Sequence, residues 1–556
     1  MHSHSLQRPH SEGRRACGDH MRHLSQLDIA VVATYLLLIF SAGMLLTRRA
    51  GRSVTDFFIG GRHLPWWLLG ISMAATNFSI DTPVSLTHFI RAEGIAGVWF
   101  FWASAISALL VAFLFARLWR RSGVLTDAEI IEQRYGGRPA AALRLFKGFY
   151  FGVLFNAFIM GWVFLAVAKV LGGLTDLPVA WILSGATALV VVYSLAAGFY
   201  GVVITDFIQY FIALAGSVTL AVLAVREVGG LGALVTGLER QGLGEKLHFV
   251  PGFGPDNLGP VSVFLTYVLV QWWAHKYADG GGKHIQRMLS ARSEQDAFAA
   301  TLLYAFVNYA VQVWPWILTA LASLLLFEEL ADHEQAYALT MARVLPAGLL
   351  GLVLASLIGA FMSTIDTHLN LGASYIINDI YRRFVRPTAS ERHYVRMSRL
   401  AMLALLAISI ALALNMNSVA GAWKFLLTFA AGAGPVWIIR WYWWRVNAWS
   451  EFAAMIASGV VASWIELAHG DWLYSTKLIV TIAVTAAVWI PATLLTAPVD
   501  GERLRAFSAT IRPGGPGWRR VSGRMRAGPG PALARWLLAL AALFGLNFGV
   551  GWWLLR

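Results

Sequence analysis

Ala360-Phe361-Met362-Ser363-Thr364-Ile365-Asp366-Thr367 lies inside an otherwise apolar run that extends from residue 349 to residue 377. The run is long enough to cross a bilayer, because a spanning helix needs about 20 residues. A carboxylate in mid-membrane costs about 2.5–3.5 kcal/mol and needs a compensating partner. Hydroxyls beside a carboxylate supply hard oxygen ligands, so the stretch predicts a site for a hard cation. At helical spacing, one stripe collects the small and polar residues Ser356, Ala360, Ser363, Asp366, Thr367, Asn370 and Ser374.

The composition predicts an all-α polytopic membrane protein. Of the 556 residues, 58% are hydrophobic and 13% are charged, whereas soluble domains carry about 25% charged residues. Apolar segments of spanning length recur along the chain, and we predict fourteen. They lie near residues 27–47, 65–90, 95–117, 143–172, 178–197, 200–225, 260–279, 297–327, 345–380, 397–415, 421–444, 450–467, 475–497 and 532–554.

The net charge of +14 is explained by membrane topology rather than by nucleic-acid binding. Lys and Arg concentrate in alternate loops near 48–62, 117–147, 276–292, 382–399 and 500–531, and are almost absent near 173–177, 328–342 and 468–474. The basic loops are therefore predicted to be cytoplasmic, with both termini outside a plasma or inner membrane. The arginines of residues 1–24 argue against that orientation.

Two predicted spans look interrupted. The first contains Ala75-Thr76-Asn77-Phe78-Ser79-Ile80-Asp81-Thr82-Pro83, where polar side chains and a proline weaken a continuous helix. The second runs from Trp272 through His275, Lys276 and Asp279 into the glycines 280–282. The two lie roughly 195 residues apart, and each opens a set of about five spans. Paired broken spans point to the binding site of a secondary transporter.

Several motifs resemble those of the sodium:solute symporter family, which includes sodium/glucose, sodium/proline and sodium/sialic acid cotransporters. They occur in family order over about residues 27–445. The resemblance implies a leucine-transporter-like core of five-plus-five inverted repeats, with one extra helix before it and three after it. The matching stretches are Asp56-Phe57-Phe58-Ile59-Gly60-Gly61-Arg62-His63-Leu64-Pro65-Trp66-Trp67, Ala75-Thr76-Asn77-Phe78-Ser79, Thr205-Asp206-Phe207-Ile208-Gln209, Ile285-Gln286-Arg287, Phe361-Met362-Ser363-Thr364 and Asn378-Asp379-Ile380-Tyr381.

Six regions follow from this organisation. Residues 1–24 form an arm that is expected to be disordered; its five histidines are a less favoured metal site, and Met21 is an alternative start. Cys17, the only cysteine, excludes an internal disulfide. Residues 25–64 hold the extra helix and a cytoplasmic loop, 65–445 the inverted-repeat transport core and 446–499 the accessory helices. Residues 500–531 are expected to form a basic, disordered cytoplasmic linker, and 532–556 a C-terminal helix.

The resemblance implies a sodium site made of the carbonyls of Ala75, Phe78 and Ala360 and the hydroxyls of Ser363 and Thr364. Taken alone, the two hydroxyls would more readily bond to carbonyls one turn earlier in their own helix. Together with the broken segment at residues 75–79, the two hydroxyls instead favour a cation site.

Some relatives hold a second sodium, and the corresponding positions here are Asp206, Ser363, Asp366 and Thr367. Asp366 stands where a small hydroxyl is more usual. It could strengthen a cation site, or carry a proton, because burial raises the pKa of a carboxyl. It could instead pair with an Arg, Lys or His elsewhere in the bundle.

The family pattern places the solute between the breaks, near Asn77, Thr82, Phe101, Trp272, Trp273 and His275. Sugar-transporting relatives carry a glutamate where this chain has Phe101, which counts against a glucose-like ligand. The two tryptophans could stack on a ligand or simply pack. His275 and Lys276 could meet an anionic solute, or Lys276 could reach toward the cytoplasmic interface.

We expect sodium-coupled symport of a small organic solute by alternating access, with the lipid bilayer as partner, no nucleic acid, and no cofactor or metal beyond sodium. A proton-coupled symporter of the same fold and a passive channel are the alternatives. An enzyme would need catalytic groups clustered at one membrane face, and a sensor would need a signalling domain after residue 445; neither is apparent. The oligomeric state and the identity of the solute are not indicated.

Overall fold

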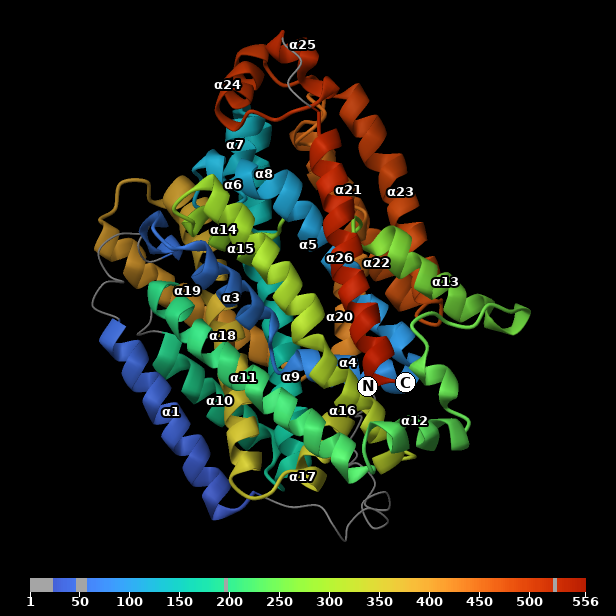
Figure 1. The fold of residues 1–556 in the computed structure, drawn as a ribbon. Helices are drawn as coiled ribbons and strands as arrows, with labels where there is room; N and C mark the ends of the chain where they lie inside the picture. The colour runs from blue at the N-terminus through green and yellow to red at the C-terminus, as the bar shows by residue number, and fades with distance from the viewer. Residues whose placement is uncertain (1–23, 47–57, 195–198, 524–527) are drawn as a thin grey trace, which may run out of the picture.

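The computed structural model describes residues 24–46, 58–194, 199–523 and 528–556, which fold almost entirely as helices (Figure 1). Within these ranges the only β interaction is an isolated bridge between Leu64 and Ala291. The expectations for the N-terminal arm, including Cys17 and the histidines, and for Asp56 and Phe57 fall outside the described residues.

Nine helical runs in the described part of the chain are long and apolar enough to cross a membrane. They are Ile95–Ser122, Gly137–Leu174, Val202–Glu227, Glu294–Leu326, Leu349–Val385, Glu391–Ala413, Ala448–Ala468, Tyr474–Leu495 and Gly530–Leu554. Three shorter apolar stretches belong to α1 (Gln26–Leu46), α10 (Val179–Ser194) and α20 (Val419–Ala431). With two broken segments, these correspond to the fourteen predicted spans.

The helices used below carry the labels of Figure 1. Several spans consist of two helices joined by a π-helical turn, such as Val307–Val311 between α15 and α16. The helices of the runs are α5 (Trp99–Leu110), α6 (Ala116–Ser122), α8 (Gly137–Phe149), α9 (Asn156–Leu174), α11 (Phe199–Glu227), α15 (Glu294–Phe306), α16 (Val313–Leu326), α18 (Leu349–Ser374), α19 (Glu391–Ala413), α22 (Ala448–Ala468), α23 (Tyr474–Leu495) and α26 (Gly530–Leu554).

The first break separates α3 (Trp66–Asn77) from α4 (Asp81–Glu93). Phe78, with φ −79° and ψ 76°, leaves the helical region and ends α3. Pro83 is the third residue of α4, where its missing amide donor costs little because the first four amides of a helix have no intrahelical acceptor. The proline is therefore accommodated by starting a new helix just before it.

The second break separates α13 (Leu258–Thr266) and its π-helical extension from α14 (Gly282–Ser290). Gly281 has a φ of +61°, and a Cβ at this position would lie 1.6 Å from Cδ1 of Tyr277. Only glycine fits such a backbone, so the glycine run makes the chain turn back into α14.

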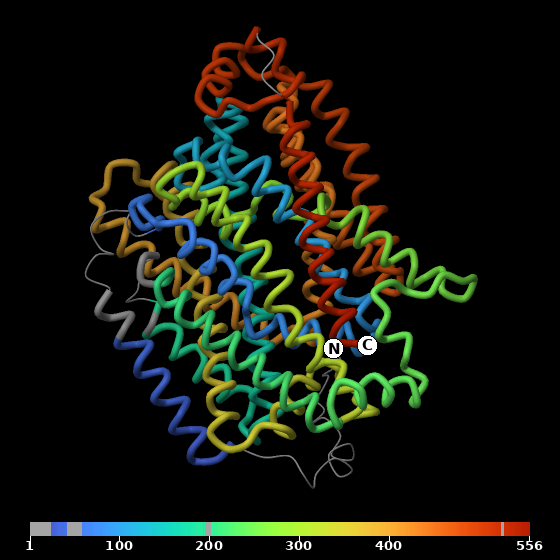
Figure 2. Tube along the Cα trace, viewed as in Figure 1, coloured from blue at the N-terminus to red at the C-terminus, as the bar shows by residue number. Residues whose placement is uncertain are grey.

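The broken helix α3 packs against α11, α15 and α18, and α18 also contacts α1, α9 and α19. The tube in Figure 2 shows these segments, far apart in sequence, running side by side through the body of the molecule. The stretch 360–367 is consequently enclosed by helices, and each of its side chains is buried.

The region after the core packs against it. Helices α22 and α23 lie together, and α26 runs along α5. The expectation that 500–531 is disordered is wrong for 501–523, which contains α24 (Gly501–Ile511) and α25 (Arg519–Ser522) at the top of Figure 1. Phe507 and Trp518 are buried, and the Trp518 indole donates to the Trp441 carbonyl at 2.7 Å. These two aromatic side chains anchor a stretch whose overall composition is basic.

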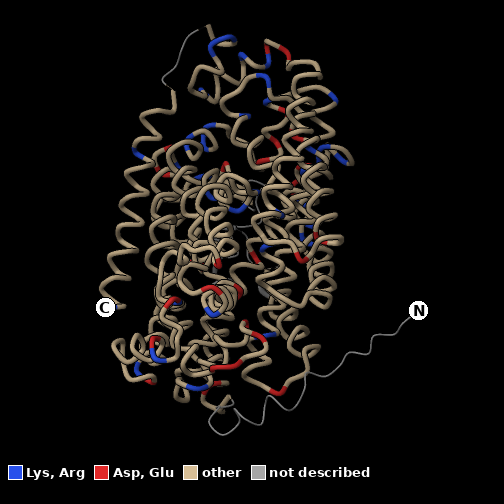
Figure 3. The backbone as a smooth tube through the Cα atoms, turned by 90° about the vertical axis from the view of Figure 1, so that its right-hand side faces the viewer, with Lys and Arg blue, Asp and Glu red and all other residues tan. Residues whose placement is uncertain are grey.

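Lys and Arg gather toward the end of the molecule that carries α24 and α25 (Figure 3). Several Lys and Arg residues that are predicted to lie in cytoplasmic loops are buried in the folded protein. Fewer exposed positive charges therefore support the predicted orientation. Arg144 pairs with Asp379 at 2.7 Å and Lys147 with Glu451 at 3.2 Å. The buried set also includes Arg134, Lys276, Lys283 and Arg287.

Candidate solute and cation site

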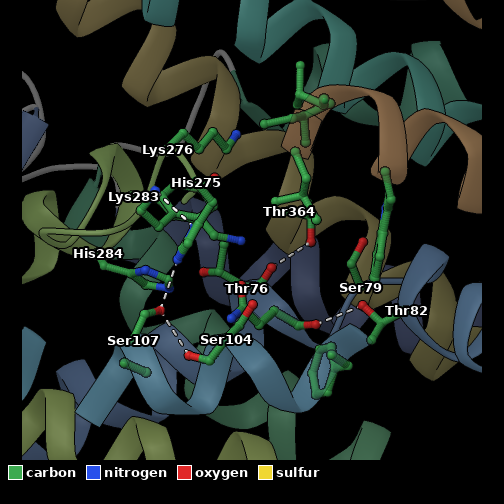
Figure 4. A pocket seen from close by; sticks show the side chains of 18 of the residues that line it. Thr76, Ser79, Thr82, Ser104, Ser107, His275, Lys276, Lys283, His284 and Thr364 are labelled. Atoms are coloured by element: carbon green, nitrogen blue, oxygen red, sulfur yellow. Dashed lines mark hydrogen bonds between the residues drawn. The ribbon is translucent and has the colours of Figure 1, made fainter. Parts of the chain in front are cut away.

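A cavity lies between the two breaks (Figure 4), with about 160 Å³ of space open to the centre of a water molecule. One water needs about 10–15 Å³ by this measure, so the cavity can hold a small organic molecule. Its wall is formed by both breaks and by α3, α4, α5, α9, α14, α15, α18 and α20. The polar and aromatic residues that line it include Thr76, Asn77, Ser79, Asp81, Thr82, Phe101, Ser104, Ser107, Trp162, His275, Lys276, Lys283, His284, Thr301, Tyr304, Tyr309, Thr364, His368 and Trp423.

Four of the six predicted solute residues line this cavity, namely Asn77, Thr82, Phe101 and His275. Trp272 and Trp273, the other two, do not line it. The Trp272 ring packs 5.6 Å from that of Trp536 on α26, and the Trp273 indole donates to the Leu269 carbonyl at 2.8 Å. Both precede the turn into the cavity: Trp272 packs against α26, and Trp273 bonds back to its own segment.

Both ring nitrogens of His275 bond to the protein around the second break, so neither is left to bind a solute. Its Nδ1 accepts the backbone amide of Tyr277 at 3.1 Å, so this nitrogen carries no proton. The proton on Nε2 then points to the Trp272 carbonyl at 3.0 Å and the Ser107 hydroxyl at 3.1 Å. Both ring nitrogens are satisfied by the protein, which makes His275 a neutral wall residue.

Sequence reasoning missed Lys283, His284 and His368 as cavity residues. Lys283 follows the glycine run and is predicted to lie in a cytoplasmic loop. The sequence does not show that the chain turns at these glycines and enters α14 beside the cavity. His368 lies one turn beyond Thr364 on α18. Its Nδ1 bonds to the Asn156 side chain at 2.6 Å, and within the described residues its Nε2 has no partner.

The residues of the first predicted cation site meet where α18 crosses the break after α3. The Thr364 hydroxyl donates to the Thr76 carbonyl at 3.3 Å. At the break, no described backbone amide donates a hydrogen bond to the carbonyl of Ala75 or of Phe78. Thr364 therefore bonds across to the break instead of back to its own helix, and carbonyl oxygens at the α3 C-terminus carry the negative end of the helix dipole.

Ser363 turns toward α11, where its hydroxyl donates to Asp206 Oδ1 at 2.5 Å. The other Asp206 oxygen accepts from Ser72 at 2.6 Å and from the Arg287 guanidinium at 3.2 Å. Arg287 also donates to Thr367 at 3.0 Å. Three of the four residues predicted for a second cation are thus brought together, and they surround the fixed positive charge of Arg287.

Asp366, the fourth, is directed elsewhere. Its Oδ1 accepts a hydrogen bond from the Ser194 hydroxyl of α10, and in the described part of the chain Oδ2 has no hydrogen-bond partner. Among the described residues, Asp366 thus contacts a hydroxyl, and the alternative in which it pairs with an Arg, Lys or His is not observed.

Two broken helices that face each other across a polar cavity, with a hydroxyl-bearing helix against one break, define a secondary transporter. The chain belongs to the sodium:solute symporter family, whose model matches residues 57–458. It is a multi-pass membrane protein, and its activity is sodium-coupled symport rather than catalysis.

Known relatives are distant in sequence. The sodium/glucose cotransporter of Vibrio parahaemolyticus is 24% identical over 515 residues, covering 88% of this chain and 93% of that protein. The Bos taurus sodium/myo-inositol cotransporter is 26% identical over 452 residues, covering 70% and 58%. A substrate-bound, outward-open structure of a Na+-coupled sialic acid symporter superposes with a TM-score of 0.69 at 19% identity, covering 86% of this chain and 99% of that one. The fold is thus the leucine-transporter-like fold implied by the motifs.

Proposed function

We propose that the coupling sodium binds where α18 crosses the first break, held by the carbonyls of Ala75, Phe78 and Ala360 and the hydroxyls of Ser363 and Thr364. The observation that carries this assignment is the bond from Thr364 to the Thr76 carbonyl at 3.3 Å. It supports the assignment because a side chain that reaches an unwound helix end brings hydroxyl and carbonyl oxygens to one point, and such oxygens are the ligands hard cations prefer.

The solute then occupies the adjoining cavity, and alternating access carries both ligands across the membrane. Thr76 and Thr364 belong both to the cavity wall and to the neighbourhood of the cation site. Sodium bound there would fix the unwound end of α3 and thereby shape the solute cavity. This connection supports coupled symport over a passive channel, in which the two ligands need not interact.

The proposed orientation places the end with α24 and α25 in the cytoplasm. Support comes from the concentration of Lys and Arg at that end in Figure 3. Helix α1 begins, and α26 ends, toward the opposite side of Figure 1. Both termini would then lie outside.

Thr364→Ala tests the cation site. Loss of one of five oxygen ligands should remove about 1–3 kcal/mol, which weakens sodium affinity about 5- to 150-fold. Sodium binding is measured on the purified full chain from the rise in melting temperature with sodium against potassium, without any solute. Thr364→Ser keeps the hydroxyl and should retain affinity.

Thr340→Ala is the matched control, because Thr340 is also fully buried but its hydroxyl bonds to the Ala336 carbonyl within its own helix. Wild-type sodium affinity in Thr364→Ala would overturn the site. For the proton-coupled alternative, stabilisation would follow pH and be indifferent to sodium.

A further inference from the structure

The wall of the solute cavity carries more formal positive than negative charge. It contains two lysines, Lys276 and Lys283, but one carboxylate, Asp81. Asp81 Oδ2 accepts the indole protons of Trp162 and Trp423 at 2.9 and 3.1 Å. Within the described residues, no carboxylate lies within 4.0 Å of either cavity lysine. Neither ammonium group therefore has an ion-pair partner in contact, and the charge of Asp81 acts on Lys283 only across a longer distance.

Other buried cations of the molecule have oxygen acceptors in direct contact. Arg287 pairs with Asp206 at 3.2 Å, and Arg440 with Asp279 at 2.6 Å. Lys147, which is 1% exposed, pairs with Glu451 at 3.2 Å. Burying an unpaired charge is unfavourable by several kcal/mol. Arg91 and Arg134, which are also buried, have backbone carbonyl acceptors instead. A fold that gives its other buried cations carboxylate or carbonyl acceptors, but gives Lys283 neither, points to an acceptor supplied by the ligand.

The two lysines are not equivalent. The Lys276 ammonium lies 4.5 Å from the ring centre of Tyr277 and 5.0 Å from that of Phe155, so two aromatic faces offset part of its charge. Lys283 has no hydrogen bond, ion pair or aromatic face among the described contacts, although its side chain is only about 9% exposed. Lys283 is accordingly the primary anchor, and Lys276 adds a second positive charge beside it.

We propose that the cavity takes a small hydroxylated organic anion, of the sugar-acid or hydroxy-acid class, whose carboxylate binds Lys283. This inference rests on the proposed function, since it names the solute of that symport site. The opposite wall suits hydroxyl groups. The Ser79 hydroxyl and Asp81 Oδ1 are buried next to each other and bond to no other residue in the described structure, and Figure 4 places Ser79 and Thr82 across from the lysine–histidine side.

Asp81 does not cancel the positive wall. Its two indole donors already offset part of its charge, and Oδ1 is an acceptor for a solute hydroxyl. The wall therefore presents cations for a carboxylate at one side and acceptors for hydroxyl protons at the other. A neutral sugar would leave Lys283 without an anionic partner, whereas a simple fatty acid would offer no hydroxyl group to Ser79 and Asp81.

Matched pairs of probes test the proposal: glucuronate against glucose, and gluconate against sorbitol. Each pair keeps the hydroxylated carbon chain and differs in the carboxylate. The full-length protein in detergent is heated in sodium buffer with each probe. We expect at least one acid to raise the melting temperature and its neutral partner to have no effect. Charge-assisted hydrogen bonds contribute about 1.5–3 kcal/mol, so Lys283→Met should weaken that binding at least about tenfold, and Lys283→Arg should retain it.

Two further measurements separate a binding role from a structural one. Without probe, Lys283→Met should melt no lower than wild type, because it removes an uncompensated buried charge. Lys477→Met is the matched control, since Lys477 pairs with Glu466 outside this cavity at 2.9 Å, and it should bind the acid like wild type.

The inference is overturned if neither acid stabilises more than its neutral partner, or if Lys283→Met binds the acid as tightly as wild type. It is also overturned if Lys283→Met lowers the melting temperature without probe. In each case the proposed symport stands as long as sodium alone still stabilises the protein through Thr364. Loss of that sodium response would instead refute the proposed function.

Discussion

Arg287 should be the costliest single side chain to remove from the transport core. It is fully buried, and Arg287→Met deletes its charge while keeping much of its volume. Its contacts join α14 to α3, α11 and α18: Ser72 at 2.9 Å, Thr76 at 2.7 Å, Asp206 at 3.2 Å, Thr367 at 3.0 Å and the Lys283 carbonyl at 3.2 Å.

The magnitude follows from the fate of Asp206, which is 0% exposed. After Arg287→Met its carboxylate retains the Ser72 and Ser363 hydroxyls but loses its counter-ion. Breaking a buried pair in this way costs about 3–5 kcal/mol, whereas replacing both partners is often neutral. Asp206→Asn should cost a similar amount, and the double variant should be far less destabilised than the sum of the two.

The free energy of unfolding of the four proteins is measured in mixed micelles by SDS titration with tryptophan fluorescence. The expected coupling between the two sites exceeds about 1.5 kcal/mol. In Arg287→Met, sodium should also stabilise more than it does in wild type, because the vacated space is bordered by oxygens. Single variants that each cost less than about 1 kcal/mol, or an additive double variant, would refute the ion-pair argument.

Two more predictions concern individual carboxylates. Asp366→Asn should lower the number of cations moved per solute if Asp366 serves a second ion or carries a proton; flux ratios in proteoliposomes measure this, and an unchanged ratio removes Asp366 from coupling. Burial raises the pKa of Glu334 in the 333–335 turn, but Lys169 at 2.6 Å and the amides of Val419 and Ala420 outweigh it and hold the pKa below its usual range. Its stabilisation is therefore present above the unfolded pKa of about 4.3 and is lost as pH falls through the folded pKa. The difference in melting temperature between wild type and Glu334→Gln should shrink on acidification, and a constant difference would contradict the assignment.

The breaks in the fold could be predicted from sequence because they follow from local backbone rules. Pro83 removes an amide donor, and the glycines at 280–282 adopt backbone conformations that other residues rarely adopt. Both breaks can therefore be located from the sequence. The meeting of Thr364 with the break needed the family pattern in addition, since a hydroxyl in a helix bonds equally well to its own backbone.

Side-chain direction beyond a break could not be predicted in the same way. Trp272 and Lys283 flank the same unwound segment, yet the tryptophan turns to α26 and the lysine turns to the cavity. Their directions depend on the angle at which the chain re-enters α14, which is set by packing against α3, α15 and α18. The same uncertainty made Phe507 and Trp518 look like part of a disordered linker, because their binding surface exists only in the folded core.

Helix α14 connects the two halves of the site. Lys283 faces the solute cavity, and one turn later Arg287 bonds to the Lys283 carbonyl and to the side chains around Asp206. Gln286 of the same helix donates to Asn370 on α18 at 2.7 Å. An anion that draws Lys283 into the cavity would therefore displace the helix that also holds the residues near the cation. With both proposed sites occupied, this nine-residue helix would be the structural route by which solute and cation influence each other.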